Sequence, residues 1–149
     1  MPTTTSVLSD LYRELRGSGP PVLFISGASG DAGHFAGAAA RLADEFTTVA
    51  YDRRGCSRSA GPPDGETMSI AAQADDAAAL IEELGLAPAI VFGTSGGGDI
   101  ALELVARRPE LVRGAIVQPR HRPARRWTWS LHPGGLRFAS SRGGRRRPP

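Results

Sequence analysis

The chain has 149 residues, a length that fits one domain with a modest hydrophobic core. Its single cysteine, Cys56, excludes a disulfide framework and a cysteine zinc site, and favours a cytoplasmic protein. Lysine is absent, which excludes a phosphate-binding loop ending in Gly-Lys-Ser/Thr and a lysine Schiff base. The sequence holds neither a long apolar run nor a charged-then-apolar leader, so we expect a soluble, untargeted protein without membrane association. We also expect neither a cofactor nor a metal.

The net charge of +3 conceals two segments of very different composition. Residues 1–118 contain all fifteen acidic residues and nine arginines, whereas residues 119–149 contain nine arginines and no acid. The second segment is also rich in proline, glycine and serine and has no hydrophobic periodicity. The sequence therefore predicts a folded part over residues 1–118 and a disordered basic tail over residues 119–149.

Alternating strand and helix patterns between Pro21 and Gln118 predict a parallel α/β sheet. Residues 7–16 precede it and are compatible with either a helix or a short edge strand. Continuous apolar runs predict buried strands, and apolar side chains at helical spacing predict covering helices. The expected strands are residues 22–25, 47–51, 90–92 and 114–117, and the expected helices are residues 33–44, 69–84 and 97–107.

The most informative motif is Gly93-Thr94-Ser95-Gly96-Gly97, which follows a buried strand directly and opens an amphipathic helix. This context is typical of a nucleophile elbow, where a sharp turn needs small residues two positions either side of a serine. The turn presents the serine hydroxyl above the sheet, and the helix N-terminus lies behind it. The pattern therefore predicts a nucleophilic serine at Ser95 with the Gly96 N–H directed at a developing oxyanion.

Three segments in this order resemble the N-terminal half of an α/β-hydrolase of the esterase, lipase and peroxidase-like type. Residues 17–27 resemble the entry to the family's third strand, residues 52–59 the loop after its fourth, and residues 93–97 the nucleophile position after its fifth. The resemblance covers about residues 11–117. It implies a three-layer α/β-hydrolase core that is incomplete in this chain, followed by the disordered tail.

The resemblance also implies roles for individual residues. Ser95 would be the acyl-accepting nucleophile, and the backbone N–H groups of Gly96 and Ala28 would form the oxyanion hole. Ser26 replaces the histidine that the family usually has before Gly27, a change expected to weaken the hydrogen-bond support of this loop. His34 and Ser29 are candidates for the wall of the substrate pocket.

A serine hydroxyl becomes a good nucleophile only when a histidine accepts its proton and an acid orients that histidine. After Ser95 the carboxylates are Asp99, Glu103 and Glu110, all in the next helix or just beyond its end. Asp99 reads as a solvated or capping charge. The later histidines, His121 and His132, lie in the predicted tail, and His34 as a base would break the family's chain order. Cys56 reads as a small loop residue.

These observations lead to a function with stated alternatives. The chain is expected to be an α/β-hydrolase-type serine hydrolase for small carboxylic esters, truncated or frameshifted after its sixth strand and weakly active or inactive. One alternative is a non-catalytic remnant of the fold. Another is a nucleic-acid-binding tail, in which the arginines of residues 119–149 bind phosphates beside Trp127 and Trp129; this is the less favoured interpretation. An exposed sheet edge at residues 115–117 would permit self-association.

Overall fold

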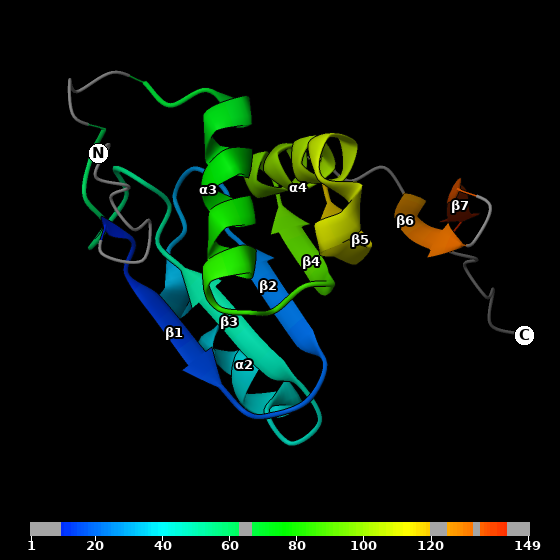
Figure 1. Cartoon of the computed structure of the whole chain (residues 1–149), viewed down its shortest axis with the longest axis horizontal. Helices are drawn as coiled ribbons and strands as arrows, with labels where there is room; N and C mark the ends of the chain where they lie inside the picture. The colour runs from blue at the N-terminus through cyan, green and yellow to red at the C-terminus, as the bar shows by residue number, and fades with distance from the viewer. Residues whose placement is uncertain (1–9, 63–66, 120–124, 133–134, 143–149) are drawn as a thin grey trace, which may run out of the picture.

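The structure is a computed structural model that describes residues 10–62, 67–119, 125–132 and 135–142 (Figure 1). Its framework is one sheet with the strand order β1-β3-β2-β4-β5-β6-β7. Strands β2, β3, β4 and β5 run parallel, and β1 pairs antiparallel with β3. The bounds of the strands are β1 Arg13–Arg16, β2 Pro21–Ile25, β3 Thr47–Tyr51, β4 Ala89–Thr94, β5 Val112–Gln118, β6 Arg125–His132 and β7 Gly135–Arg142.

Helices cover both faces of the parallel strands, as the three-layer prediction requires. Helices α3 (Ile70–Glu83) and α4 (Gly96–Arg107) lie in front of the strands in Figure 1, and α2 (Ala36–Leu42) lies behind them. A short 3-10 helix, η1 (Ala32–Phe35), precedes α2, and η2 (Pro109–Leu111) precedes β5. Within the described residues, no helix is both long enough and apolar enough to span a bilayer.

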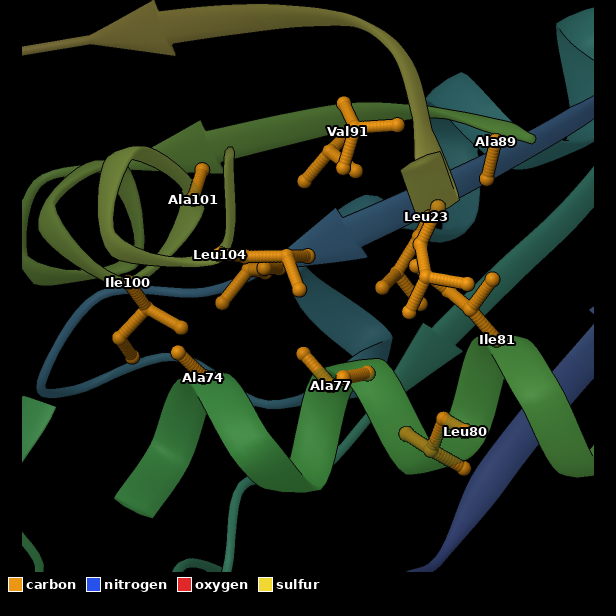
Figure 2. Close-up of a cluster of buried hydrophobic side chains, with 14 of the residues drawn as sticks. Leu23, Ala74, Ala77, Leu80, Ile81, Ala89, Val91, Ile100, Ala101 and Leu104 are labelled. Atoms are coloured by element: carbon orange, nitrogen blue, oxygen red, sulfur yellow. The ribbon is translucent and has the colours of Figure 1, made fainter. Parts of the chain in front are cut away.

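The main hydrophobic core fills the space between the sheet and the helices α3 and α4. Figure 2 shows Leu23 and Val91 of the strands facing Ala77 and Ile81 of α3 and Leu104 of α4, all of them fully buried. A smaller cluster on the other face packs Phe24 and Phe92 against Phe35 at the start of α2. Alternate residues of β2 thus enter different cores, as expected for a strand that is covered on both sides.

Most predicted elements agree with the structure, with shifts at their ends. The strand predicted over residues 47–51 has those bounds, and the helix predicted over residues 69–84 spans Ile70–Glu83, with the Ser69 hydroxyl accepting a hydrogen bond from the Ala72 N–H. The helix predicted over residues 33–44 is shorter and begins with the 3-10 turn η1. In the ambiguous segment, Arg13–Arg16 form the edge strand β1, and residues 7–9 lie outside the described part.

The structure differs from the prediction of a disordered tail at β6 and β7, which extend the sheet as an antiparallel hairpin. The prediction rested on the overall composition of the tail and did not take account of a short run of strand-forming residues within it. The segment Trp127-Thr128-Trp129 consists of aromatic and β-branched residues that favour strands, and it pairs with Val117, Ile116 and Ala115. The tail residues 120–124, 133–134 and 143–149 lie outside the described part.

This hairpin also corrects the expected exposed edge at residues 115–117. Those residues make ladder pairs with β6, so their backbone groups are engaged in the sheet. The edge strands of the described sheet are β1 and β7. The expected self-association stays a prediction, with β1 and β7 in place of residues 115–117 as its described edges.

Candidate active site

The carboxyl ends of β2 and β4 are the expected location of a ligand site in this sheet. These strands are neighbours, but the connection after β2 passes to the α2 face and the connection after β4 passes to the α4 face. A sheet opens a crevice where adjacent strands diverge in this way, and ligands bind there in open α/β folds. The loops after β2 and β4 contain Ala28 and Ser95, two of the residues predicted for the site.

Ser95 lies between β4 and α4 in a backbone conformation that few residues adopt. Its φ of 52° and ψ of −122° fall in a region that is unfavourable for a residue with a side chain. Its N–H donates to the Gln118 carbonyl at 2.8 Å, and its carbonyl accepts from the Gly98 N–H at 2.9 Å. The strained turn is thus held from both sides, by β5 and by the first turn of α4.

Glycines permit the close approach of α4 to the strands. A Cβ atom on Gly97 would lie 2.1 Å from the Ile25 carbonyl oxygen, and one on Gly93 would lie 2.3 Å from the Gly97 carbonyl oxygen. A Cβ atom on Gly27 would lie 2.9 Å from the Ser95 Cβ atom. Backbone atoms therefore meet where β2, β4 and α4 converge. This contact brings the loop after β2 beside the Ser95 side chain.

A pocket of about 420 Å³ opens at this junction. It is lined by residues from three segments, namely Gly27, Ala28, Ser29, Gly30 and His34 after β2, Thr94 and Ser95 after β4, and Gln118 and Pro119 after β5. The structure therefore brings together four predicted site residues: Ser95, Ala28, Ser29 and His34. Thr94, Gln118 and Pro119 also line the pocket but were not predicted as site residues, because they carry no chemical signal in the sequence.

The two predicted oxyanion donors belong to residues near Ser95: Ala28 lines the same pocket, and Gly96 follows Ser95 in the chain but is not among the lining residues. Gly96 is the first residue of α4, and a helix leaves its first N–H groups without partners inside the helix. The Ser95 N–H donates to the Gln118 carbonyl. The next backbone N–H along the chain, that of Gly96, lies at the N-terminus of α4. Ala28 is exposed and lines the pocket, directly after Gly27. The arrangement is compatible with two backbone N–H groups facing one bound oxygen atom.

The loop after β2 retains hydrogen-bond support despite the serine at position 26. The buried Ser26 hydroxyl donates to the Gly30 carbonyl at 3.0 Å and closes the loop on itself. The Gly30 N–H in turn donates to the Gly27 carbonyl at 3.2 Å. The expected weakening is therefore offset by a bond that the sequence pattern did not reveal.

Charged groups in the loop after β3 connect that loop to the segment after β2 and to α3. The fully buried Asp52 carboxylate accepts from the Ala32 N–H at 2.8 Å and from the Arg58 side chain at 2.7 and 3.0 Å. Burial opposes ionisation of this carboxyl, but the hydrogen bonds from Arg58 and Ala32 outweigh it and lower the pKa of Asp52. Arg54 binds both carboxylate oxygens of Asp76 on α3 at 2.9 Å, and these bonds raise the pKa of Arg54.

The remaining candidates take different positions. Asp99 is exposed in the first turn of α4, in line with a solvated charge. Among the histidines, His34 is exposed at the pocket wall, His132 is the last residue of β6, and His121 lies outside the described part. Cys56 is a half-buried free thiol in the loop after β3. Over the residues that the structure describes, no three His, Cys, Asp or Glu side chains gather as a metal site would require.

Comparison with known proteins identifies the family. The model of the alpha/beta hydrolase fold family matches residues 20–124. The chain belongs to the α/β-hydrolase fold family. A hydrolase of Bacillus subtilis, YraK, whose name describes it as uncharacterized, is 41% identical over 108 residues, which cover 72% of this chain and 40% of YraK.

Solved structures of this family superpose on the chain. E-2-(acetamidomethylene)succinate hydrolase matches with a TM-score of 0.71 and 33% identity, over 80% of this chain and 44% of that one. A thermophilic esterase from Thermogutta terrifontis matches with a TM-score of 0.68 and 30% identity, over 72% of this chain and 39% of that one. The chain thus spans about two-fifths of the length of these α/β-hydrolases.

The close approach at Gly97 predicts a matched pair of variants. Gly97→Ala would push a methyl group into the Ile25 carbonyl, whereas a Cβ on Gly96 meets nothing within 4 Å. We expect Gly97→Ala to lower the free energy of unfolding by about 3 kcal/mol and Gly96→Ala to change it little. Urea unfolding followed by circular dichroism measures both. Equal stability of the two variants would contradict the contact.

Proposed function

We propose that this chain carries the nucleophile and oxyanion half of a serine hydrolase that acts on small carboxylic esters or related acyl compounds. Ser95 would attack the acyl carbonyl carbon, and the N–H groups of Gly96 and Ala28 would stabilise the tetrahedral oxyanion. The observation that carries the proposal is the strained Ser95 backbone, with φ of 52°, at the wall of a pocket shared with Ala28. The named relatives, an esterase and a succinate-derivative hydrolase, act on small molecules and support this substrate class.

The surroundings of Ser95 favour a developing negative charge on the oxyanion more than they favour removal of the Ser95 hydroxyl proton. The N-terminus of α4 points at the Ser95 side chain, so the helix dipole favours negative charge there. No acidic residue follows Glu110 in the sequence, and the histidine that shares the described pocket is His34. For a triad in the family's order of serine, acid and histidine, this sequence therefore offers no acid after Glu110, which lies just beyond the helix that follows the nucleophile. We accordingly expect weak ester turnover by this chain alone.

The composition of residues 119–149 leads to a second part of the proposal. The change from an acidic segment to one with nine arginines and no acid is the pattern expected when a G+C-rich gene is read in a shifted frame. We infer that the hydrolase reading frame is broken near Gln118. The acid and the histidine of the triad would then be encoded downstream in another frame.

Two other interpretations remain as outcomes of the tests. A non-catalytic remnant of the fold would keep the pocket but show no chemistry that depends on Ser95. A nucleic-acid-binding tail would bind an oligonucleotide through the arginines of residues 119–149 in a salt-sensitive manner. For location, the single cysteine supports the cytoplasm, where thiols stay reduced.

Resequencing the gene across codons 110–149 tests the broken frame. We expect one of the two alternative frames downstream to continue with strand and helix patterns, an aspartate and a late histidine. A contradiction would be the absence of any such continuation in both frames.

Exogenous imidazole tests the nucleophile, because a free base can enter the open pocket and accept the Ser95 proton. We expect p-nitrophenyl acetate hydrolysis at pH 8 to rise with imidazole until it saturates. The rate should exceed that of Ser95→Ala at the same imidazole concentration by about tenfold or more. The Ser95→Ala reaction also corrects for hydrolysis by imidazole in solution.

Ser18→Ala is the matched control, since Ser18 is an exposed hydroxyl between β1 and β2 and does not line the pocket. It should keep the imidazole-dependent rate. Equal rates for the wild type and Ser95→Ala would refute the nucleophile assignment. A wild-type rate that needs no imidazole and disappears in His34→Gln would instead identify His34 as the base.

A further inference from the structure

We propose that Arg53 is a positioning residue that aims the Ala28 N–H into the oxyanion hole; this inference rests on the proposed function. The Arg53 guanidinium donates through one NH2 group to the Gly27 carbonyl at 3.0 Å. It donates through the other to the Gln73 side-chain oxygen. Arg53 follows β3, Gly27 follows β2 and Gln73 lies on α3, so one side chain joins three elements.

The geometry of a peptide group connects Arg53 to the predicted oxyanion donor. The Gly27 carbonyl and the Ala28 N–H belong to the same peptide unit, which is planar and trans, so the two groups point in opposite directions. A donor that fixes the Gly27 oxygen on the side of Arg53 therefore fixes the Ala28 N–H on the other side. Ala28 lines the pocket that contains Ser95, so an N–H directed away from Arg53 could serve a ligand in that pocket.

This peptide needs support from outside its own segment. Gly27 must lack a side chain, because a Cβ would lie 2.9 Å from the Ser95 Cβ atom and 3.1 Å from the Thr94 carbonyl oxygen. Glycine is also the residue whose backbone rotates most freely, so the local sequence does not hold the peptide plane. The Gly27 carbonyl instead accepts two bonds, from Gly30 within the loop and from Arg53 outside it.

The Arg53 side chain is itself held in place. Gln73 is buried, and its side-chain N–H donates to the Met68 carbonyl at 3.1 Å, which directs the Gln73 oxygen toward Arg53. The neighbouring Arg54 is bound to Asp76 and Asp10 and so anchors the same loop to α3. The positive charge of Arg53 also lies on the carbonyl side of the Gly27–Ala28 peptide. A charge there polarises the peptide and makes the Ala28 N–H a stronger donor.

Amide spectra of the full chain test the geometry without reference to catalysis. We expect Arg53→Met, which keeps bulk and removes the donors, to shift the Ala28 N–H resonance and to speed its hydrogen exchange. The Gly96 N–H resonance should stay unchanged. Arg53→Lys keeps a charged donor and should restore part of the wild-type signal. An unchanged Ala28 resonance in Arg53→Met would overturn the proposal.

The imidazole-dependent hydrolysis of p-nitrophenyl acetate that requires Ser95 tests the consequence for the site. We expect Arg53→Met to lower its kcat about tenfold with little change in KM, because a misdirected donor is lost mainly in the transition state. Arg53→Lys should recover part of the loss. Arg41→Met, an exposed arginine at the end of α2, is the control and should retain the full rate.

The outcomes separate this inference from the proposed function. If the wild type has no rate that depends on Ser95, the proposed function fails, and the Ala28 resonance alone decides on Arg53. If the rate is present and Arg53→Met retains it, the positioning role is wrong. Should Arg53→Met fail to fold in urea titrations, Gln73→Met replaces it. That variant removes the second anchor of Arg53, and we expect a smaller shift of the same Ala28 resonance.

Discussion

The site depends on the contact between the backbone of α4 and the carboxyl end of β2. Gly97 lies so close to the Ile25 carbonyl that even a methyl group would overlap it, and Gly93 and Gly27 are restricted in the same way. Because these backbones touch, Ser95 cannot relax into an ordinary turn and keeps its positive φ. The same contact places the Gly27–Ala28 peptide against the Ser95 side chain. The proposed nucleophile and the proposed oxyanion loop thus share one packing constraint.

Hydrogen bonds from the loop after β3 stabilise this arrangement. Asp52 connects the end of β3 to η1 through the Ala32 N–H, and Arg54 connects the same loop to α3 through Asp76. Arg53 extends the network to the Gly27 carbonyl. Asp52 and Arg54 each have a partner of opposite charge, which limits the cost of burying them, whereas Arg53 has neutral acceptors and its buried Nε has no hydrogen-bond partner among the described residues. A rigid support of this kind is what a preorganised oxyanion hole requires.

Much of the fold could be predicted from the sequence, because its signals are local. The apolar run of β3 and the helical spacing of α3 follow from periodicity alone, and Gly93-Thr94-Ser95 could be located because a strand and a helix flank it. The Arg53 and Ser26 hydrogen bonds could not be predicted, since they join residues through the tertiary fold. The hairpin of β6 and β7 was missed because arginine and proline dominate the composition around its strand-forming tryptophans.

The part of the family fold that this chain spans determines which half of a hydrolase site it can hold. The matched part of the chain contains the proposed nucleophile Ser95 and the proposed oxyanion loop, and it spans about two-fifths of the length of its hydrolase relatives. In this chain the site can therefore be considered in two parts. One is the electrostatic half, built from backbone N–H groups and a helix N-terminus. The other is the proton-transfer half, which this sequence does not provide in the family's order.

Covalent labelling with an organophosphonate in the presence of imidazole would test whether Ser95 is the nucleophile of this site. The reagent forms a bond to an activated serine and places its phosphoryl oxygen where the oxyanion would lie. Mass spectrometry of the intact chain and its peptides then locates the adduct. We expect one adduct on Ser95 and none in Ser95→Ala. Labelling of other serines, or no labelling at all, would contradict it.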